Sequence, residues 1–467
     1  MLFSPRNDIV CVRVVGFHFS ITFLLLAQLI LVVSGPLVAQ EAEKTLRGWA
    51  SAVEAWQRGQ ITPNRMVQDP DPSRRGLLVS YDVPPQRFPR GFHRSATYDD
   101  AIAALSFLVR GDRDGAAFTL HALARQVRSN GSLWFGYNTA NDWPGEADHE
   151  GAIVRAGAVG WAGYALTYYL AHPSLCGGNR GCERERAFFL ETARRLANYL
   201  LSLQVNQQGD ARDGLLRVGY GVINLSYRQD TNQVIEQYLD EPALEISTEN
   251  NISAWFFLRQ LAKLTGENRW GQAADRIQRG LLRATWNSAL GQFNGGFKVD
   301  GSADSTKALD CASWGTLFLL AAQEPEKASE ALRAIEGTYA ARDGEARGYR
   351  PYSDFPIYKD PEVGRYYFPE NPRKEWRDFP LVWSEGTLGV ALAYLRMGRA
   401  DRARRVIEGL RPLQVKNSGL RYASRDLPYH MRDAPSVAAC AWLVLVAEDL
   451  NGNPLAKDFW RDRKSVV

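Results

Sequence analysis

The sequence predicts an all-α fold in which six helical hairpins form a double-ring (α/α)6 barrel. Three observations support this prediction: helical periodicity recurs along the chain, strand signals are sparse, and two kinds of helical segment alternate. One kind is apolar on nearly every side, whereas the other has a single apolar face. A helix that is apolar all round must be enclosed, and a two-faced helix lies outside it.

Six segments are of the enclosed kind and are expected to form the inner ring: 101–109, 152–169, 252–264, 312–322, 387–395 and 437–447. Five two-faced segments follow them: 113–128, 184–206, 268–287, 325–341 and 400–411. Segment 44–58 is expected to supply the sixth outer helix and to close the circle beside the last inner one. Gly111, Gly266 and Gly398 each end an inner segment, where a left-handed cap favours glycine.

Residues 1–40 read as a secretory signal. Arg6 and Arg13 give a basic start, 14–33 is an apolar run, and small residues follow it. The alternative is an uncleaved membrane anchor, because the run is close to the roughly 20 residues that span a bilayer. We therefore expect a secreted or periplasmic protein, or one anchored in the membrane and facing the periplasm. Residues 41–467 are expected to form a single barrel domain.

Composition excludes several function classes. A net charge of +4 on 467 residues is too weak to indicate a nucleic-acid partner. The six histidines are scattered without metal-ligand spacing, so no metal site and no cofactor is expected. A monomer is expected. Cys176 and Cys182 flank a glycine-rich loop and could form a disulfide, whereas Cys311 and Cys440 read as buried thiols.

Acidic residues stand at the start of each predicted inner helix. They are Asp99 and Asp100, Glu150, Glu249, Asp310, Glu385 and Asp433. Parallel inner helices would bring all of them to one rim of the barrel. The competing explanation is local, because acids also cap helix N-termini and are favoured there by the helix dipole.

Aromatic residues accompany these acids, mostly in the long polar stretches before the inner helices. The predicted sugar-binding residues are Trp134, Tyr137, Trp143, Trp314, Trp383 and His430, together with Asp99 and Glu150. Core packing is the alternative explanation for the aromatic members. Carboxylates beside aromatic rings suit a carbohydrate, because acids exchange protons with a glycosidic oxygen and rings stack on sugar faces.

Segments 247–251, 308–315 and 383–389, with the alternating helices, resemble the six-hairpin glycosidase superfamily, which includes glucoamylases and related glucanases. No single subfamily matches. The resemblance implies an (α/α)6 barrel, a substrate funnel at the inner-helix N-termini, and hydrolysis by an acid–base pair, most often with inversion. Under this hypothesis Glu249 is the general acid and Glu385 the general base, with Asp310 and Asp100 in reserve for either role.

The function expected is therefore an exported glycoside hydrolase that cleaves a poly- or oligosaccharide. Two alternatives remain open. One is a polysaccharide lyase on the same scaffold, for which Tyr429, His430 and Arg432 supply a base and a cation. The other is a non-catalytic sugar-binding component of envelope polysaccharide biosynthesis or export, which would keep the aromatic residues without a tuned acid pair.

Overall fold

The computed structural model describes residues 45–64, 71–88, 91–140, 151–172, 180–416 and 419–461. The chain divides into two compact units, Met1–Trp49 and Ala50–Val467, and the second holds the barrel. The predicted signal over residues 1–40 lies outside the described residues. In the described ranges, no helix is long and apolar enough to cross a membrane.

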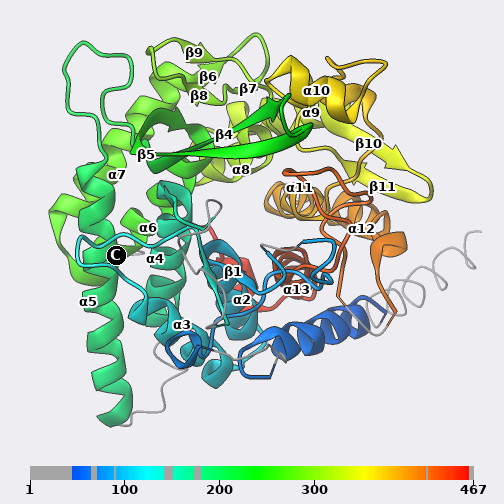
Figure 1. Ribbon diagram of the computed structural model, residues 1–467. Helices are drawn as coiled ribbons and strands as arrows, with labels where there is room; N and C mark the ends of the chain where they lie inside the picture. The colour runs from blue at the N-terminus through cyan, green and yellow to red at the C-terminus, as the bar shows by residue number, and fades with distance from the viewer. Residues whose placement is uncertain are drawn as a thin grey trace, which may run out of the picture. The chain divides into compact units, whose positions relative to one another are not determined.

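Six inner helices of the second unit form a closed ring (Figure 1). They are α2 (Thr97–Val109), α4 (Ala156–Ala171), α6 (Thr248–Thr265), α8 (Leu309–Ala321), α11 (Ser384–Arg396) and α13 (Val437–Leu450). Each helix contacts the next in this order, and α13 contacts α2. The predicted inner ring is therefore confirmed.

Each predicted outer helix packs on the inner helix that precedes it. The outer helices are α3 (Arg113–Arg125), α5 (Arg180–Ser202), α7 (Asn268–Gly280), α9 (Pro325–Tyr339) and α12 (Ala400–Glu408). A π-helical turn, η4 (Leu281–Thr285), extends α7. Gly266 caps α6 with a φ of 70°, a conformation that glycine adopts without the cost of a Cβ atom.

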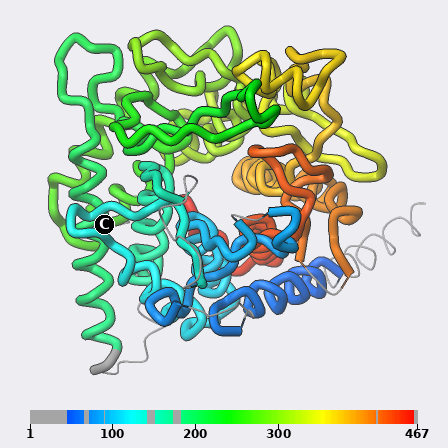
Figure 2. The backbone as a smooth tube through the Cα atoms, viewed as in Figure 1, coloured from blue at the N-terminus to red at the C-terminus, as the bar shows by residue number. Residues whose placement is uncertain are grey.

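Residues 50–60 continue a helix and occupy the sixth outer position (Figure 2). Gln57 Nε2 donates to the carbonyl of Val437 in α13 at 3.3 Å. Glu54 accepts a hydrogen bond of 2.8 Å from Arg110, directly after α2. This segment therefore joins the last inner helix to the first, as the sequence predicted.

The expectation of sparse strands was wrong for the stretch before α6. It holds the two long strands of a five-stranded antiparallel sheet in the order β3 (Val154–Arg155), β4 (Arg217–Arg228), β5 (Gln233–Ser247), β8 (Gly296–Phe297) and β9 (Ala303–Asp304). Much of β4 and β5 is partly exposed on both faces, so neither strand shows the alternation of apolar and polar residues that marks a half-buried strand.

Shorter elements fill the remaining connections. The strand pairs are β1 (Arg94–Ala96) with β2 (Gly136–Asn138), β6 (Trp286–Asn287) with β7 (Gln292–Phe293), and β10 (Ala340–Asp343) with β11 (Ala346–Tyr349). The short helices are η1 (Pro72–Arg74), α10 (Pro361–Tyr367), η5 (Trp376–Asp378), η6 (Arg411–Leu413) and α14 (Pro454–Asp458). Cys311 and Cys440 are buried free thiols, as predicted. Cys182 is disulfide-bonded, and its expected partner Cys176 lies outside the described ranges.

The hairpin of β4 and β5, here called the arch, reaches across to the connections before two other inner helices (Figure 2). Tyr227 in β4 packs against Tyr366 in α10, with ring centroids 5.9 Å apart. Tyr429, before α13, donates from its hydroxyl to the carbonyl of Val234 at 3.4 Å. The connection before α6 therefore touches those before α11 and α13.

The centre of the ring is filled by a cluster of aromatic side chains, here called the aromatic floor: Trp161, Trp314, Trp442, Phe459 and Trp460. Trp161, Trp314 and Trp442 are each the sixth residue of an inner helix. The C-terminal segment supplies the other two, and Trp460 N donates to the Tyr164 hydroxyl at 2.8 Å. The floor therefore lies about one and a half turns below the inner-helix N-termini.

Candidate active site

Four acids from four inner helices form one cluster, here called the acid cluster: Asp99 of α2, Glu249 of α6, Asp310 of α8 and Glu385 of α11. Each lies in the first turn of its helix. Asp310 interacts electrostatically with Glu249 and Glu385, and Glu385 interacts with Asp99 and Glu249. Helix α8 separates α6 from α11 in the ring. Interactions across an intervening helix show that these side chains point inward.

Two inner helices depart from the predicted pattern. Helix α4 begins at Ala156, after the short strand β3, and its first turn has no acid. Glu150 lies outside the described residues. Helix α13 also lacks a first-turn acid, and Ser436 is its N-cap residue. Asp433 precedes the helix and forms an ion pair with Arg87. The expectation of an acid in every inner-helix first turn was therefore wrong for α4 and α13.

Glu385 is held by two tyrosines. Its side chain is buried, and the Tyr98 hydroxyl donates to Oε1 at 2.6 Å. Trp442 Nε1 donates in turn to the Tyr98 hydroxyl at 2.7 Å. Burial raises the pKa of Glu385 to about 8, and the charges of Asp99 and Glu249 add to this, while hydrogen bonds from Tyr98 and Tyr422 oppose it.

Glu249 is the most accessible member of the acid cluster, and no other described residue donates a hydrogen bond to its carboxyl group. Burial raises the pKa of Glu249 to about 7. Burial, together with Glu249 and Glu385, raises the pKa of Asp310 well above its usual value. Two neighbouring carboxyl groups in an apolar setting do not both ionise readily, so ionisation of Glu249 opposes ionisation of Asp310.

Asp100 faces away from this chemistry. Its two carboxyl oxygens accept hydrogen bonds from Leu78 N and Ser95 Oγ, each at 2.7 Å. It therefore fixes the segment before β1 against α2, which favours a structural role over the catalytic one predicted in reserve. Asp99 keeps one hydrogen bond, from Ser80, and burial raises its pKa to about 7.

The predicted aromatic platforms have different surroundings. The guanidinium of Arg128 covers the Trp134 ring at 3.9 Å, and the Tyr137 hydroxyl accepts from Trp134 N at 3.0 Å, so both rings are used in packing. Trp314, at 2% exposure, belongs to the aromatic floor. Trp383 is buried next to Tyr422, with ring centroids 6.2 Å apart. Trp143 lies outside the described residues.

A row of rings leads away from the Glu249–Asp310 pair. Tyr352 interacts electrostatically with both acids and packs on Trp376, with centroids 5.2 Å apart. Trp376 contacts His430 at 5.5 Å. Desolvation by these surroundings, with Arg432 nearby, lowers the pKa of His430 to about 4, so the ring is neutral at neutral pH.

Sequence reasoning missed Tyr98, Tyr352, Trp376 and Tyr422. Tyr98 stands beside Asp99 at the start of α2, and a polar aromatic residue in the first turn of an enclosed helix was the signal available. The other three lie in long irregular connections, where no periodicity indicates direction.

No protein-family model and no curated protein matches this sequence. Solved structures match its fold. A cellobiose 2-epimerase from Bacillus thermoamylovorans matches with a TM-score of 0.55 and 10% identity, over 88% of this chain and 99% of that one. The GH76 alpha-mannanase from Bacteroides thetaiotaomicron matches with a TM-score of 0.53 and 10% identity, over 86% and 96%.

A GH63 mannosylglycerate hydrolase from Thermus thermophilus matches with a TM-score of 0.53 and 16% identity, over 85% of this chain and 99% of that one. At these identities the likeness shows the fold alone. That fold is an (α/α)6 barrel, as the sequence predicted.

Proposed function

We propose that this protein is an exported glycoside hydrolase that cleaves a poly- or oligosaccharide by carboxylate acid–base catalysis with inversion. The observation that carries the proposal is the acid cluster, in which four carboxyl groups from four inner helices share one buried site. Glycosidic cleavage requires one acid to protonate the leaving oxygen and one carboxylate to activate water.

The hydrogen-bond environments separate the two roles. Burial raises the pKa of Glu249 to about 7, and no other described residue donates a hydrogen bond to its carboxyl group, so its protonated form is favoured over that of an ordinary glutamate and it suits the general acid. Glu385 accepts hydrogen bonds from two tyrosines, which favour the ionised form. Burial is the largest cause of the rise in its pKa, to about 8, and charge on Asp99 and Glu249 adds to it. The assignment of Glu385 as the base therefore rests on its two tyrosine donors and on protonation of these two neighbours, which removes the part of the rise that they cause.

Inversion is proposed from the family resemblance. Glu249 and Glu385 belong to helices α6 and α11, which flank α8, so the two acids start from separate positions in the ring. An inverting enzyme places a water between its base and the sugar, which requires the two carboxyl groups to be well apart. Asp310 lies between them in ring order, and burial together with the charges of Glu249 and Glu385 raises the pKa of Asp310.

The structural neighbours support sugar chemistry without fixing the reaction. They include an alpha-mannanase and a mannosylglycerate hydrolase, but also a cellobiose 2-epimerase. One fold therefore serves both hydrolysis and epimerisation, and the acid cluster is the reason to favour hydrolysis here.

A polysaccharide lyase is the second candidate, because neutral His430 lies near the Arg432 cation. A neutral imidazole can remove a proton beside a uronate carboxylate that an arginine holds. A lyase would release a product that absorbs in the ultraviolet, whereas a hydrolase would not.

The test is to incubate the purified protein with a panel of neutral and acidic glycans and measure reducing ends, ultraviolet absorbance and the anomer first released. Glu249→Gln and Glu385→Gln should each reduce turnover by about 100-fold or more. Asp433→Asn, outside the acid cluster, is the matched control. Full activity in both glutamine variants would refute the assignment, and glycan binding without new reducing ends would favour the sugar-binding alternative.

Export is proposed from the basic start and apolar run of residues 1–40. Expression of the full chain, followed by cell fractionation and mass measurement, tests it. We expect a periplasmic or secreted protein that lacks about 40 residues. A full-length protein in the membrane fraction indicates the anchor, and a full-length protein in the cytoplasm contradicts export.

A further inference from the structure

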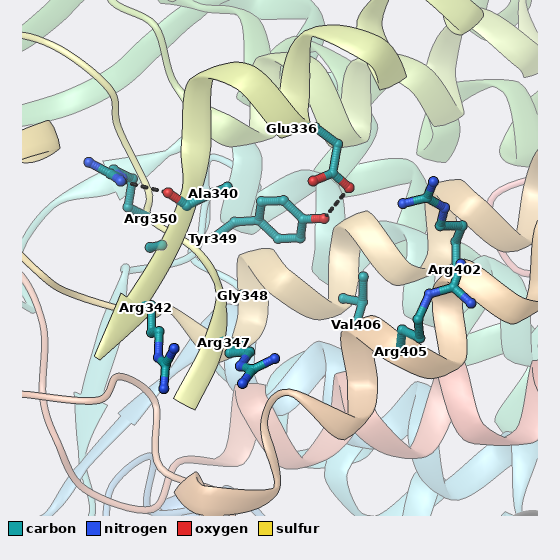
Figure 3. A pocket seen from close by; sticks show the side chains of 11 residues that line it. Glu336, Ala340, Arg342, Arg347, Gly348, Tyr349, Arg350, Arg402, Arg405 and Val406 are labelled. Atoms are coloured by element: carbon teal, nitrogen blue, oxygen red, sulfur yellow. Dashed lines mark hydrogen bonds between the residues drawn. The ribbon is translucent and has the colours of Figure 1, made fainter. Parts of the chain in front are cut away.

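We infer that the protein has a second ligand site, an arginine-lined pocket on the outside of the ring that binds the anionic groups of an acidic glycan. The pocket has a volume of about 580 Å³ and lies between α9, the β10–β11 hairpin and α12 (Figure 3). This inference rests on the proposed function for the choice of a glycan, but the pocket takes no part in the acid–base chemistry.

The charge of this pocket is strongly unbalanced. Its positive residues are Arg342, Arg347, Arg350, Arg402 and Arg405. Glu336 is the one acid that lines it. That carboxylate already accepts hydrogen bonds from Tyr349, at 2.8 Å, and from Tyr394. The guanidinium charges therefore have little compensation within the pocket.

Several of these guanidinium groups have N–H donors that are available to a ligand. The side chains of Arg347 and Arg402 are exposed and form no hydrogen bond or ion pair with other described residues. Arg405 pairs with Asp401 at 2.8 Å, and Arg342 lies 3.7 Å from Glu345, but all four side chains are exposed. Exposed pairs of this kind contribute about 1 kcal/mol or less, so a better acceptor can replace them.

Arg350 is held more firmly. Its two terminal nitrogens donate to the carbonyls of Arg377 and Ala340, while its Nε is buried without a hydrogen bond. Burial lowers the pKa of Arg350. A charged group that is partly desolvated and incompletely bonded is stabilised when an anion binds near it.

The arrangement of charges suits an oligomer. Figure 3 shows Arg402 and Arg405 on one side of the pocket and Arg342 and Arg347 on the other, with Tyr349 between them. The planar fork of a guanidinium group matches a carboxylate or sulfate. A single small anion would satisfy one or two of these groups, whereas a chain of acidic sugars presents a charge at each residue.

A hydrogen-bonded strand connects this pocket to the acid cluster. Tyr349, in β11, receives a hydrogen bond of 2.9 Å from Trp383 N at its carbonyl and donates from its amide to Thr387 Oγ1 at 2.9 Å. These partners flank Glu385 at the start of α11. One strand therefore borders the pocket on one side and the start of the Glu385 helix on the other. This proximity is the reason to assign the pocket to the same kind of polymer as the active site.

The test is calorimetric titration of the protein as it is purified after expression of the full chain. It carries Glu385→Gln, so that no ligand is hydrolysed. The probes are a tetragalacturonate, a sulfated tetrasaccharide, a neutral tetrasaccharide, inorganic phosphate and a single-stranded DNA dodecamer. The variants are Arg347→Ala with Arg402→Ala, and Arg404→Ala as the control, since Arg404 is on α12 but does not line the pocket.

We expect at least one acidic tetrasaccharide to bind, with an affinity that falls at least 10-fold in the double variant and falls with added salt. Arg404→Ala should change the affinity less than twofold. The two acidic probes distinguish carboxylate from sulfate. Equal binding by the Glu385→Gln protein with and without the two arginine substitutions, or tighter binding of phosphate or DNA than of either acidic probe, would overturn the inference.

The inference and the proposed function can fail separately. Arginine-dependent binding by a protein that hydrolyses nothing would leave the pocket and remove the hydrolase. Hydrolysis by a protein whose affinity is unchanged in the double variant would support the hydrolase and remove the arginine-lined pocket as a ligand site. Arg347→Gln with Arg402→Gln is the second form of the double variant, and circular dichroism must show native folding in both.

Discussion

The acids of the candidate site are placed where their charge costs stability. Asp99, Asp310 and Glu385 are buried at helix N-termini, where the helix dipole favours an ionised carboxylate and the loss of solvent opposes it. Their raised pKa values show that the loss of solvent dominates. Active sites commonly carry such groups because chemistry requires perturbed protonation.

The free-energy cost of burying an ionised carboxylate predicts that the stability of the protein depends on pH. Glu249 has a pKa of about 7 in the folded protein and an ordinary one, near 4.5, when unfolded. The unfolded chain therefore releases its proton first as pH rises, and stability falls between about pH 4.5 and pH 7. Glu249→Gln should unfold like wild type near pH 4.5 and be more stable by up to about 3 kcal/mol at pH 7 and above.

Denaturant unfolding at a series of pH values measures this difference. Glu326→Gln, at an exposed position of α9, is the control and should change stability little at any pH. A Glu249→Gln variant less stable than wild type at pH 8 contradicts the prediction.

Tyr98 is predicted to be a positioning residue for Glu385. Tyr98→Phe removes a donor that favours the ionised carboxylate, so the pKa of Glu385 should rise and the acidic limb of the kcat/KM profile should move up by about one pH unit. KM should change little. Tyr169→Phe removes a similar tyrosine–glutamate hydrogen bond, to Glu185, and should leave the profile unchanged. A uniform loss of rate without a shifted limb would indicate a merely structural role.

At the level of single residues, sequence patterns predicted the acids better than the rings. Asp310 and Glu385 follow a helix start that periodicity reveals. Periodicity did not reveal that Asp100, in the same first turn as Asp99, would face away from the acid cluster. Trp134 and Tyr137 lie in an irregular connection, and the sequence has no signal that Arg128 would cover the Trp134 ring. His430 packs against Tyr358 and Trp376, which lie far from it in the sequence, so no local pattern indicates these contacts.

Among the secondary-structure elements, the arch was the main surprise. Helices α3 and α12 show one apolar face each, and this pattern can be read locally. Strands β4 and β5 pair with each other and extend well beyond the core, so their stability comes from a long hairpin ladder and from contacts with α10 and Tyr429. Alternation of apolar and polar residues identifies a strand only when one of its faces is buried, and β4 and β5 are partly exposed on both faces.

The arch is predicted to restrict access of long substrates. Residues 224–237 can be removed and Ile223 joined to Tyr238 through Asn-Gly, because these two residues are paired in the ladder and Asn-Gly forms a tight hairpin turn. Unfolding free energy should change by about 1 kcal/mol or less, since the removed residues are largely exposed.

Kinetics test the role of the arch in the shortened protein. The ratio of kcat/KM on polymer to that on a short oligosaccharide should rise several-fold, because the bridge to α10 and Tyr429 is gone. Tyr227→Ala, which removes the ring contact with Tyr366 but keeps the length, is the matched comparison and should have a smaller effect. An unchanged ratio in the shortened protein would show that the arch does not limit access.

In the whole molecule, the barrel follows from the alternation of enclosed and two-faced helices, and the sequence predicted both rings. It did not predict the aromatic floor, because Phe459 and Trp460 follow the last inner helix in a segment without helical periodicity. They pack on residues more than two hundred positions earlier, including Trp161 and Phe256, and such contacts leave no local pattern.

Trp460→Ala should destabilise the whole barrel. The side chain is almost fully buried and packs on rings from α4, α6, α8 and α13. Truncation leaves a cavity among four inner helices, so the unfolding free energy should fall by about 3–5 kcal/mol. Phe188→Ala, at an outer-helix position that is 43% exposed, should cost much less. Equal losses in the two variants would show that the floor contributes no special stability.

The floor also sets the order in which the protein can be completed. A ribosome delivers residues 50–60 before any of the inner helices, yet their ring neighbour α13 and Trp460, which packs in the centre, emerge after the other five inner helices. Until then the nascent chain has hairpins but no closed circle, and its apolar inner helices lack their last partner. Such a delay would suit the proposed export, because a barrel that is still open can be threaded through a membrane, and it makes any prematurely terminated product a target for proteolysis.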